Sequence, residues 1–483
     1  MVLDLELFRV DKKGNPEIIR ENQRKRFKDV TLVDKVVEND INWRELRYIC
    51  DKYNSIKKLC SKEIGIRIKN NEDSDEKLEV VKILSIDSFK PEVLKSSSIT
   101  QIKNFKYFLD KSMNEYEDKM NILEKARNEA LKEIGNILHL SVPISNNEDN
   151  NETIFTSGNV SIYKKYSHVD LVQMIEGVDT EVGPEVSGKR GYYLKGPCVL
   201  LQMALVQFAL HKWFSKGYQP IYTPYFMRKE IMQEVAQLSQ FDEELYRIVG
   251  KSVNGEQESL DQDEKYLIAT SEQPLAALHR GQWLPETSLP IRYIGQSACF
   301  RQEVGSHGRD TGGIFRVHQF EKIEQFVLTS PFEEKSWEMM DEMLDNCKEF
   351  YDQLGIAYRV VNIVSGALNN SASKKLDLEA WFPGSGAFRE LVSCSNCLDY
   401  QSRRLLVRYG QTKKMNEPQS FVHMLNATAC ATTRVICAVL ETYQMDEGIE
   451  IPGVLKKYFP QDYPDVIPFK KVFPLLPKDN KQQ

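Results

Sequence analysis

The chain has 483 residues, which is enough for two or more domains and a large core. Charged residues make up 28% of it and hydrophobic residues 41%, as in ordinary soluble globular proteins. The net charge of −6 excludes a surface that is basic throughout and binds nucleic acid without selection. A local basic patch is compatible with this charge, so possible partners have to be assessed segment by segment.

The first residues, MVLDLEL, are acidic and contain no long apolar run, so neither a signal peptide nor a transit peptide fits them. No stretch of the chain approaches the length of a bilayer span, and we expect no membrane association. Nine cysteines are scattered without the rhythm of a disulfide framework, which suits a reducing compartment. We therefore expect a cytoplasmic protein.

Apolar residues recur at helical spacing from about 41 to 69 and again from about 100 to 138. Leu46 and Ile49 begin the first series, which continues in steps of three and four. A narrow apolar seam of this kind predicts two long amphipathic helices. A polar, charged segment (70–98) lies between them, so the simplest arrangement is an antiparallel helical hairpin that projects as an arm.

The first helix of this arm is basic within an acidic protein. Between residues 41 and 69, eight lysines and arginines stand against three acidic residues, which gives a local charge of +5. Such charge runs usually belong to a solvated coiled-coil face, and on the arm alone that explanation is as good as RNA binding. The candidate RNA-binding residues of the arm are Arg44, Lys57, Lys58, Lys62 and Lys103.

A linker is predicted at 141–165, where Pro143 and many Asn and Glu residues occur. It separates an N-terminal domain (1–140) from a mixed α/β region (166–483). Loops join most neighbouring strands of this region, which favours a mainly antiparallel sheet flanked by helices, an α+β fold, over a doubly wound parallel one. After an apolar helix at 199–214, β-type runs are expected at 221–222, 266–269, 291–300, 314–328, 358–364, 388–392 and 421–425, before a last helix at 431–443.

Four residue pairs have the even spacing that places both members on one face of a strand. One such pair is usually just a polar outer face, but four in one antiparallel sheet predict a single polar floor. Arginine beside a stackable ring and paired carboxylates suits a surface on which a nucleotide and a zwitterion lie, since these residues are rarely buried unpaired. The pairs are Thr270 with Glu272, Arg301 with Glu303, Phe320 with Glu324, and Asn426 with Thr428.

Three segments resemble the signature motifs of class II aminoacyl-tRNA synthetases. The sequence GYQPIYTP, at the end of a segment from about 199 to 224, is similar to motif 1 and implies a homodimer formed through this region. The segment from about 291 to 327, which contains FRQE and HQF, is similar to motif 2. The segment from about 421 to 443, which contains NATACATTR, is similar to motif 3.

The sequence ATSE at 269–272, FRELVS at 388–393 and the helical arm narrow the resemblance to seryl-tRNA synthetases of the eukaryotic cytosolic type. Residues 239–262 are similar to an insertion of that group. The resemblance implies a class II catalytic domain at 166–483 and a tRNA-binding domain at 1–140. It also implies ATP-dependent activation of L-serine to seryl-adenylate and transfer of the seryl group to tRNA(Ser), and to tRNA(Sec) as well.

The resemblance further implies roles for individual residues. Arg301 would hold the substrate carboxylate and the α-phosphate, Phe320 would stack under adenine, and Arg434 would cover the ring. Arg301, Glu390 and Arg434 would be catalytic, while Glu390 and Ser393 would hold Mg²⁺. The serine-binding residues would be Thr270, Glu272, Arg301, Glu324, Asn426 and Thr428. The ATP-binding residues would be Arg301, Gln302, Glu303, Arg316, Val317, His318, Gln319, Phe320, Glu390, Leu391, Val392, Ser393 and Arg434.

Two other interpretations stay open beside this one. Another class II synthetase would usually carry a separate C-terminal anticodon-binding domain, for which we expect no room after motif 3. A non-catalytic paralogue that binds RNA or protein through the arm would typically lose the motif arginines, yet Arg301, Arg316 and Arg434 are present. Cys394 and Cys397 form a single CxxC pair, which cannot complete a four-ligand zinc site, so we expect no zinc.

Overall fold

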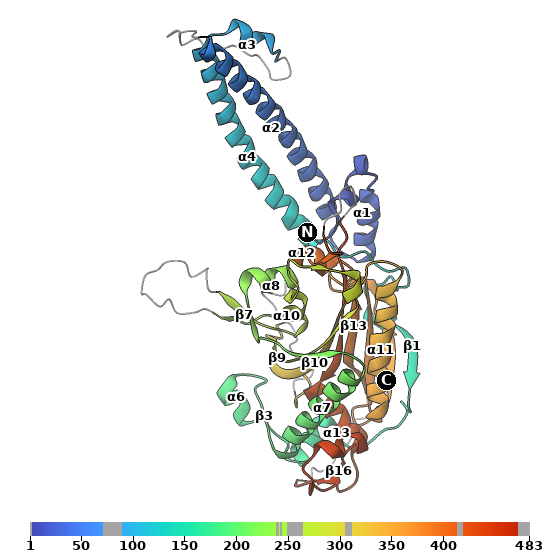
Figure 1. Ribbon diagram of the computed structural model, residues 1–483. Helices are drawn as coiled ribbons and strands as arrows, with labels where there is room; N and C mark the ends of the chain where they lie inside the picture. The colour runs from blue at the N-terminus through green and yellow to red at the C-terminus, as the bar shows by residue number, and fades with distance from the viewer. Residues whose placement is uncertain are drawn as a thin grey trace, which may run out of the picture. The chain divides into compact units, whose positions relative to one another are not determined.

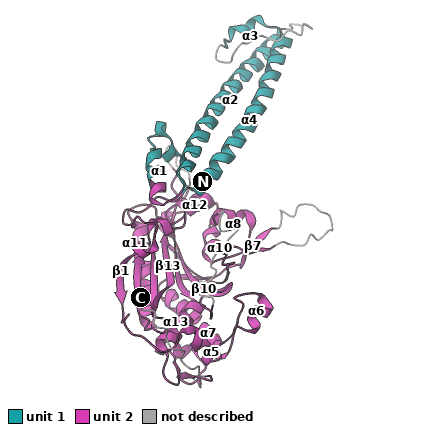
Figure 2. Cartoon of the chain, turned by 180° about the vertical axis from the view of Figure 1, so that it is seen from behind, with its two compact units in different colours: residues 1, 3–21, 29–134 teal, residues 2, 22–28, 135–483 magenta. Residues whose placement is uncertain are grey.

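The computed structural model describes residues 2–70, 89–237, 241, 244–248, 264–304, 312–412 and 419–471. It contains two compact units, which Figure 2 colours separately. The arm unit comprises residues 3–21 and 29–134, and the sheet unit comprises residues 22–28 and the chain from Gly135 onward. Residues 251–262 of the predicted insertion, and 71–88 of the predicted connection within the arm, lie outside the described residues.

The arm unit is built on two long helices, α2 (Thr31–Lys69) and α4 (Ile99–Glu133), which run side by side in Figure 1. They confirm the predicted helical hairpin. Tyr53, Phe105 and Leu109 are among the buried side chains of the seam between the two helices. The shorter elements of this unit are η1 (Leu5–Phe8), η2 (Val10–Lys12), α1 (Pro16–Lys25), whose end belongs to the sheet unit, and α3 (Glu92–Ser96).

Helix α2 begins ten residues before its predicted start at 41. A buried ion-pair cluster explains why the sequence pattern missed these first turns. Asp40 is 2% exposed, and it accepts hydrogen bonds from Nε and Nη2 of Arg9, each at 2.8 Å, and from Nη1 of Arg127 at 3.1 Å. Arg44 also contacts this carboxylate, at 3.2 Å. A charged residue at an inward position interrupts the apolar periodicity, so the sequence pattern missed the first turns of the helix.

The sheet unit contains a sheet with the strand order β1-β11-β12-β13-β15-β10-β9-β4. Its neighbouring strands are antiparallel except β4 and β9, which confirms the predicted mainly antiparallel sheet. The strands are β1 (Glu152–Ser157), β4 (Gln219–Tyr222), β9 (Ile291–Phe300), β10 (Gln319–Thr329), β11 (Tyr358–Asn362), β12 (Lys374–Phe382), β13 (Ala387–Asn396) and β15 (His423–Ala431).

The two faces of the central strands differ in chemistry. Along β15, Leu425, Ala427 and Ala429 belong to the main apolar core, while the alternate residues Asn426 and Thr428 line a cavity. This alternation is the period-two pattern of a strand that has different surroundings on its two sides. The core is completed by three helices, α7 (Gly196–Ser215), α11 (Lys335–Gln353) and α13 (Thr432–Tyr443).

Smaller elements complete the sheet unit. Its other helices are η4 (Glu148–Asn150), α5 (His168–Met174), α6 (Val182–Ser187), α8 (Lys229–Val235), α10 (Glu272–Ala277), η5 (Glu286–Ser288), η6 (Ser365–Ala367), α12 (Tyr400–Leu405) and η7 (Gly453–Tyr458). Its other strands are β2 (Val178–Asp179), β3 (Tyr193–Leu194), β5 (Phe226–Arg228), β6 (Arg247–Ile248), β7 (Lys265–Leu267), β8 (Trp283–Leu284), β14 (Arg408–Tyr409), β16 (Gly448–Glu450) and β17 (Val466–Pro468). Among the described residues, no helix combines the length and apolar character that crossing a membrane requires.

In the large sheet, the structure differs from the sequence prediction at two strands. β1 lies inside the predicted linker (141–165), where it pairs with β11 at the edge of the sheet. Its residues are mostly exposed, so no apolar alternation marked it. β12 was not predicted, although Leu376 and Leu378 alternate with polar residues along it.

We predict that Asp40→Ala lowers the free energy of unfolding of the arm unit by about 3 kcal/mol. The reason is that the guanidinium of Arg127, with a side chain 5% exposed, loses its buried carboxylate partner. Asp34→Ala is the control, because its carboxylate pairs with Arg20 at the surface and should contribute less than about 1 kcal/mol. Urea unfolding followed by circular dichroism measures both values, and equal small losses would contradict the prediction.

Candidate active site

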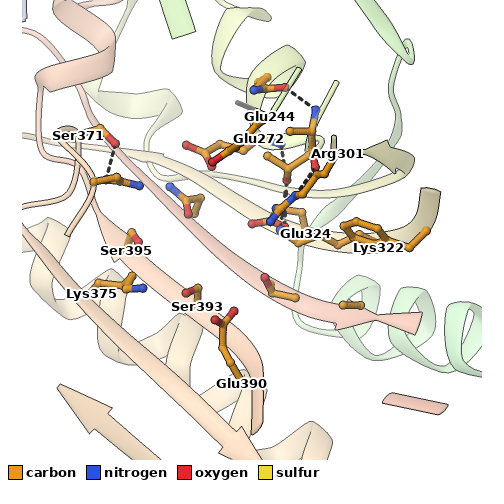
Figure 3. A pocket seen from close by; sticks show the side chains of 18 of the residues that line it. Glu244, Glu272, Arg301, Lys322, Glu324, Ser371, Lys375, Glu390, Ser393 and Ser395 are labelled. Atoms are coloured by element: carbon orange, nitrogen blue, oxygen red, sulfur yellow. Dashed lines mark hydrogen bonds and ion pairs between the residues drawn. The ribbon is translucent and has the colours of Figure 1, made fainter. Parts of the chain in front are cut away.

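A polar cavity of about 360 Å³ lies over the central strands of the sheet unit. Side chains of β10, β13 and β15 line it together with residues that follow β7 and β9. Charged groups from distant parts of the chain meet here. In Figure 3, Lys375, Glu390 and Ser393 lie on one side of the cavity, and Glu272 and Arg301 lie on the other.

One end of the cavity gathers deeply buried polar groups. Nζ of Lys322 pairs with the carboxylate of Glu324 and lies 3.2 Å from Oγ1 of Thr270, which lies 3.4 Å from Oε2 of Glu324. The strand register places Thr428 of β15 beside Glu324, and Asn426 follows on the same face. Each of these five residues is less than a tenth exposed. Such a group suits a small ligand that carries its own charges and hydrogen-bonding groups.

Glu272 adds a second carboxylate to this end of the cavity. It is the first residue of α10, and its Oε1 accepts a hydrogen bond from Nε2 of Gln401 at 2.7 Å. Burial raises the pKa of Glu272, and the negative charge of Glu324 raises it further. Two carboxylates this close favour a ligand with a positive charge, because a cation relieves their repulsion.

The other end of the cavity combines aromatic rings with arginines. The guanidinium carbon of Arg301 lies 5.6 Å from the ring centre of Phe320. Nη1 of Arg316 lies 2.7 Å from Oε2 of Glu303, a residue whose φ of 53° places its backbone in the left-handed region. Residues other than glycine that adopt such strained backbone conformations occur most often at functional sites. A flat ring among cations is the arrangement that a nucleotide base and its phosphates need.

Arg434 also lies at this end of the cavity, near the start of α13. Its Nη1 donates to the backbone oxygen of Glu390 at 3.1 Å and lies 3.3 Å from the carboxylate of the same residue. Its guanidinium carbon lies 5.0 Å from the ring centre of Phe315. Burial raises the pKa of Glu390, but the positive charges of Arg434 and Lys375 outweigh it and hold that pKa below its ordinary value.

Glu390 and Ser393 are brought to the same cavity by an irregularity in β13. The register of β12 against β13 shifts between Leu378 and Glu379, so the two residues face the cavity although they are three apart. Oγ of Ser393 donates to Oδ1 of Asp377 at 2.6 Å, and Nζ of Lys375 lies 3.1 Å from Oδ2. Burial raises the pKa of Asp377 to about 6. The donated proton leaves the lone pairs of Ser393 for another partner.

These oxygen groups fit a hard cation such as Mg²⁺, which uses one or two protein oxygens together with water and phosphate oxygens. Among the described residues, no group of three or more His, Cys, Asp or Glu side chains gathers as a metal site. Cys394 and Cys397 are both buried and free, and their sulfur atoms contact different groups.

Four residues of the predicted ATP set do not line the cavity. The side chain of Gln302 donates to the backbone oxygen of Leu245, and Gln319 is exposed. Nδ1 of His318 lies 2.8 Å from the backbone oxygen of Arg301, and Val392 belongs to the apolar core. Each of the four nevertheless lies next in sequence to a residue that does line the cavity.

The predicted strand setting is wrong for two of the four pairs. Thr270 and Glu272 follow β7 and enter α10, and Arg301 and Glu303 lie beyond the end of β9. All four residues nevertheless line the cavity.

Sequence reasoning missed several lining residues. Lys322 lies between Phe320 and Glu324, two residues from each on the predicted strand, but no role was predicted for it from the sequence. Gln401 and Ser395 carried no recognisable signal. Lys375, which lines the cavity, and Asp377, which contacts the lining residue Ser393, lie on β12, the strand that was not predicted. Their alternation with Leu376 and Leu378 could have revealed both the strand and its polar face.

On the arm, the five candidate RNA-binding residues have different surroundings. Arg44 contacts Asp11 and Asp40, and Lys57 pairs with Asp110. The other three candidates are exposed, on α2 or α4. They are Lys58, Lys62 and Lys103.

Comparison with known proteins shows to which family of class II synthetases the chain belongs. The family model for the seryl-tRNA synthetase N-terminal domain matches residues 2–93, and the model for the tRNA synthetase class II core domain (G, H, P, S and T) matches residues 255–443. The cytoplasmic serine–tRNA ligase of Mus musculus is 58% identical over 487 residues, which cover all of this chain and 94% of that protein. The chain belongs to the seryl-tRNA synthetase family.

Solved structures of seryl-tRNA synthetases agree with this assignment. The cytoplasmic enzyme of Naegleria fowleri, in complex with AMP, has a TM-score of 0.86 and 48% identity, over 98% of this chain and 100% of that one. The enzyme of Pyrococcus horikoshii, complexed with ATP, has a TM-score of 0.80 and 35% identity, over 94% and 98% of the two chains. This chain is therefore a class II aminoacyl-tRNA ligase.

Proposed function

We propose that this synthetase activates L-serine with ATP and then transfers the seryl group to the 3′ end of tRNA(Ser), and of tRNA(Sec), in the cytoplasm. The observation that carries the proposal is the single cavity in which Thr270, Glu272 and Glu324 face the arginines and the ring of Phe320. The names of the similar proteins supply the amino acid and the compartment. Arg301, Arg316 and Arg434 all line this cavity, which argues against a non-catalytic paralogue.

Serine would bind at the end of the cavity that is rich in carboxylates. Its ammonium group would lie near Glu272 and Thr270, and its hydroxyl would be enclosed by Glu324, Asn426 and Thr428. Alanine would leave these buried groups without partners, which costs more than a lost methyl contact does. Threonine would be excluded by the shape of the pocket.

ATP would occupy the opposite end, with adenine between Phe320 and Arg434. Glu303 would accept from the adenine amino group, and Arg316 would contact the terminal phosphates. These two residues form an ion pair at 2.7 Å, so a phosphate of the nucleotide would replace the carboxylate partner of Arg316 with a group of the same charge. Glu303 would exchange its ion pair for a hydrogen bond from the neutral amino group of adenine.

The chemistry would need no covalent nucleophile from the protein. An oxygen of the serine carboxylate attacks the α-phosphorus of ATP in line, and the bond to the β-phosphate oxygen breaks, which releases pyrophosphate. Arg301 would hold both the attacking carboxylate and the α-phosphate, where negative charge builds up. In the second step a terminal ribose hydroxyl of the tRNA attacks the seryl carbonyl carbon, and AMP leaves with the bonding electrons. Catalysis would rest on positioning and on charge stabilisation.

Glu390 and Ser393 would hold Mg²⁺, with Asp377 orienting the hydroxyl of Ser393. The bound cation would neutralise negative charge on the phosphate oxygens. The protein contributes the geometry, because the shifted register of β13 turns both side chains toward the cavity.

The arm would recognise the sugar–phosphate backbone and the shape of the tRNA, as proteins generally recognise double-stranded RNA. A homodimer is proposed through the motif 1 region, where apolar side chains are exposed: Met203 and Phe214 of α7 and Tyr222 of β4 are each at least 60% exposed. Large apolar side chains that are exposed to this degree suit an association surface.

Serine-dependent exchange of pyrophosphate into ATP tests the proposal directly. We expect exchange with serine and about 10⁴-fold less with alanine, since the pocket hydrogen-bonds a hydroxyl. Threonine should also fail to support exchange. Absence of exchange with serine, or faster exchange with another amino acid, would refute the proposed function.

The raised pKa of Glu272 predicts how serine binding depends on pH. The protonated carboxyl cannot attract an ammonium, and a raised pKa means that it becomes protonated at a higher pH than an ordinary carboxyl does. As the pH falls, the KM for serine should therefore begin to rise at a higher pH than an ordinary carboxyl would produce, while the KM for ATP changes less. Glu272→Gln should have a high KM for serine that no longer follows this titration. An unchanged pH profile in that variant would contradict the role of Glu272.

For the arm, we predict that changing Lys58, Lys62 and Lys103 to Glu together raises the KM for tRNA about tenfold or more. Lys57 is omitted because it pairs with Asp110. The triple variant should retain serine-dependent pyrophosphate exchange and should show a weaker dependence of tRNA binding on salt. Lys335→Glu, at an exposed lysine of α11, serves as the control. Equal loss of exchange and aminoacylation in the triple variant would contradict this role.

A further inference from the structure

We propose that Arg26 and Cys397 are positioning residues for serine recognition, which they support from behind the pocket through the segment 369–372. This inference rests on the proposed function, whose serine pocket it extends. Neither residue lines the cavity itself. Both belong to the sheet unit, although Arg26 comes from the short stretch 22–28, which is separated from the rest of that unit in sequence by most of the arm.

Arg26 holds the backbone of the segment 369–372. It is fully buried, and its Nη2 donates to the backbone oxygens of Asn369, Asn370 and Ala372, at 3.1, 3.4 and 2.8 Å. Burial lowers the pKa of Arg26 to about 10, so the guanidinium remains charged at neutral pH. The planar group can satisfy several carbonyl oxygens at once, which a lysine cannot do in the same geometry.

The chain directly after α4 braces the same segment. Asn136 donates its backbone N–H to the oxygen of Asn370 at 2.7 Å, and its Nδ2 donates to the backbone oxygens of Ser371 and Cys397, each at 2.8 Å. Gly135 lies so close to Arg26 that a Cβ atom there would be 2.4 Å from Nε. No larger residue fits at this position unless the arginine moves.

The braced segment reaches the serine pocket through two contacts. Asn369 and Ser371 line the cavity, and Oγ of Ser371 donates to Oδ1 of Asn369 at 3.0 Å. Sγ of Cys397 lies 3.7 Å from Oγ of Ser371 and 3.7 Å from Nδ2 of Asn426. Asn426 is one of the residues proposed to surround the serine hydroxyl. The sulfur of Cys397 therefore restrains the amide of Asn426 from the side away from the ligand.

The two cysteines of the CxxC pair have different roles in this arrangement. Sγ of Cys394 lies 3.9 Å from the backbone oxygen of Met340, in the apolar core under α11. Burial raises the pKa of Cys397 to about 12, so its thiol stays neutral beside the pocket. Both thiols are fully buried, which makes Cys394 a matched control for Cys397.

The first test compares Cys397→Ala with Cys394→Ala in serine-dependent pyrophosphate exchange. For Cys397→Ala we expect the KM for serine to rise about tenfold and the KM for ATP to change less than about twofold, because only the amino-acid pocket loses its support. The ratio of kcat/KM for serine to that for alanine should fall, and Cys397→Ser should restore part of it. Cys394→Ala should lower the Tm and leave the KM for serine unchanged.

The second test uses Arg26→Lys, which keeps the charge but loses the fork, with Arg20→Lys as its control on α1. Arg20 pairs with Glu17 and Asp34 at the surface, so its replacement should leave both KM values unchanged. Arg26→Lys should raise the KM for serine about fivefold or more, with ATP little affected.

The outcomes separate this inference from the proposed function. If the unmodified protein shows no serine-dependent exchange, the proposed function fails. If it does show exchange, but Cys397→Ala and Arg26→Lys leave the KM for serine and the discrimination against alanine unchanged, the inference is wrong. Equal effects of Cys394→Ala and Cys397→Ala on the KM for serine would overturn it as well.

Discussion

The alternation of side chains along the central antiparallel strands is the constraint on which the site depends. On β15, alanine and leucine side chains face the core that the helices cover. Asn426 and Thr428, which alternate with them along the strand, face the cavity on the other side of the sheet. A shift by one residue would exchange the two sets, so the buried face holds the polar face in register. The apolar packing of α7, α11 and α13 thus determines where the substrate groups lie.

Charge pairing explains how so many ionised groups coexist in this cavity. Arg316 with Glu303, Arg434 with Glu390, and Lys322 with Glu324 each combine opposite charges. An isolated charge would be costly in such surroundings, whereas a paired one is tolerated. A ligand has to offer phosphate or ammonium groups that match these charges, and selectivity follows from that requirement.

The sequence predicted those parts of the site that follow a regular period or a known motif. Asn426 with Thr428 and Phe320 with Glu324 were found because they lie two and four residues apart on true strands. Thr270 and Glu272 were found through the motif, although their local structure is not a strand. Lys375 and Asp377 were missed because β12 was missed, and Arg26 could not be found because its contacts are more than 340 residues away. Long-range contacts of this kind leave no local pattern.

The course of the chain near Arg26 bears on how the protein can be divided. Residues 22–28 pack with the sheet unit, yet arm residues precede and follow them in sequence. A fragment that starts at Gly135 would therefore lack residues 22–28, which belong to the sheet unit. Without Arg26, the backbone oxygens of residues 369, 370 and 372 would lose the guanidinium that holds them. To obtain an enzyme without its arm, the hairpin should be shortened from its far end, with α1 and the residues after it kept in place.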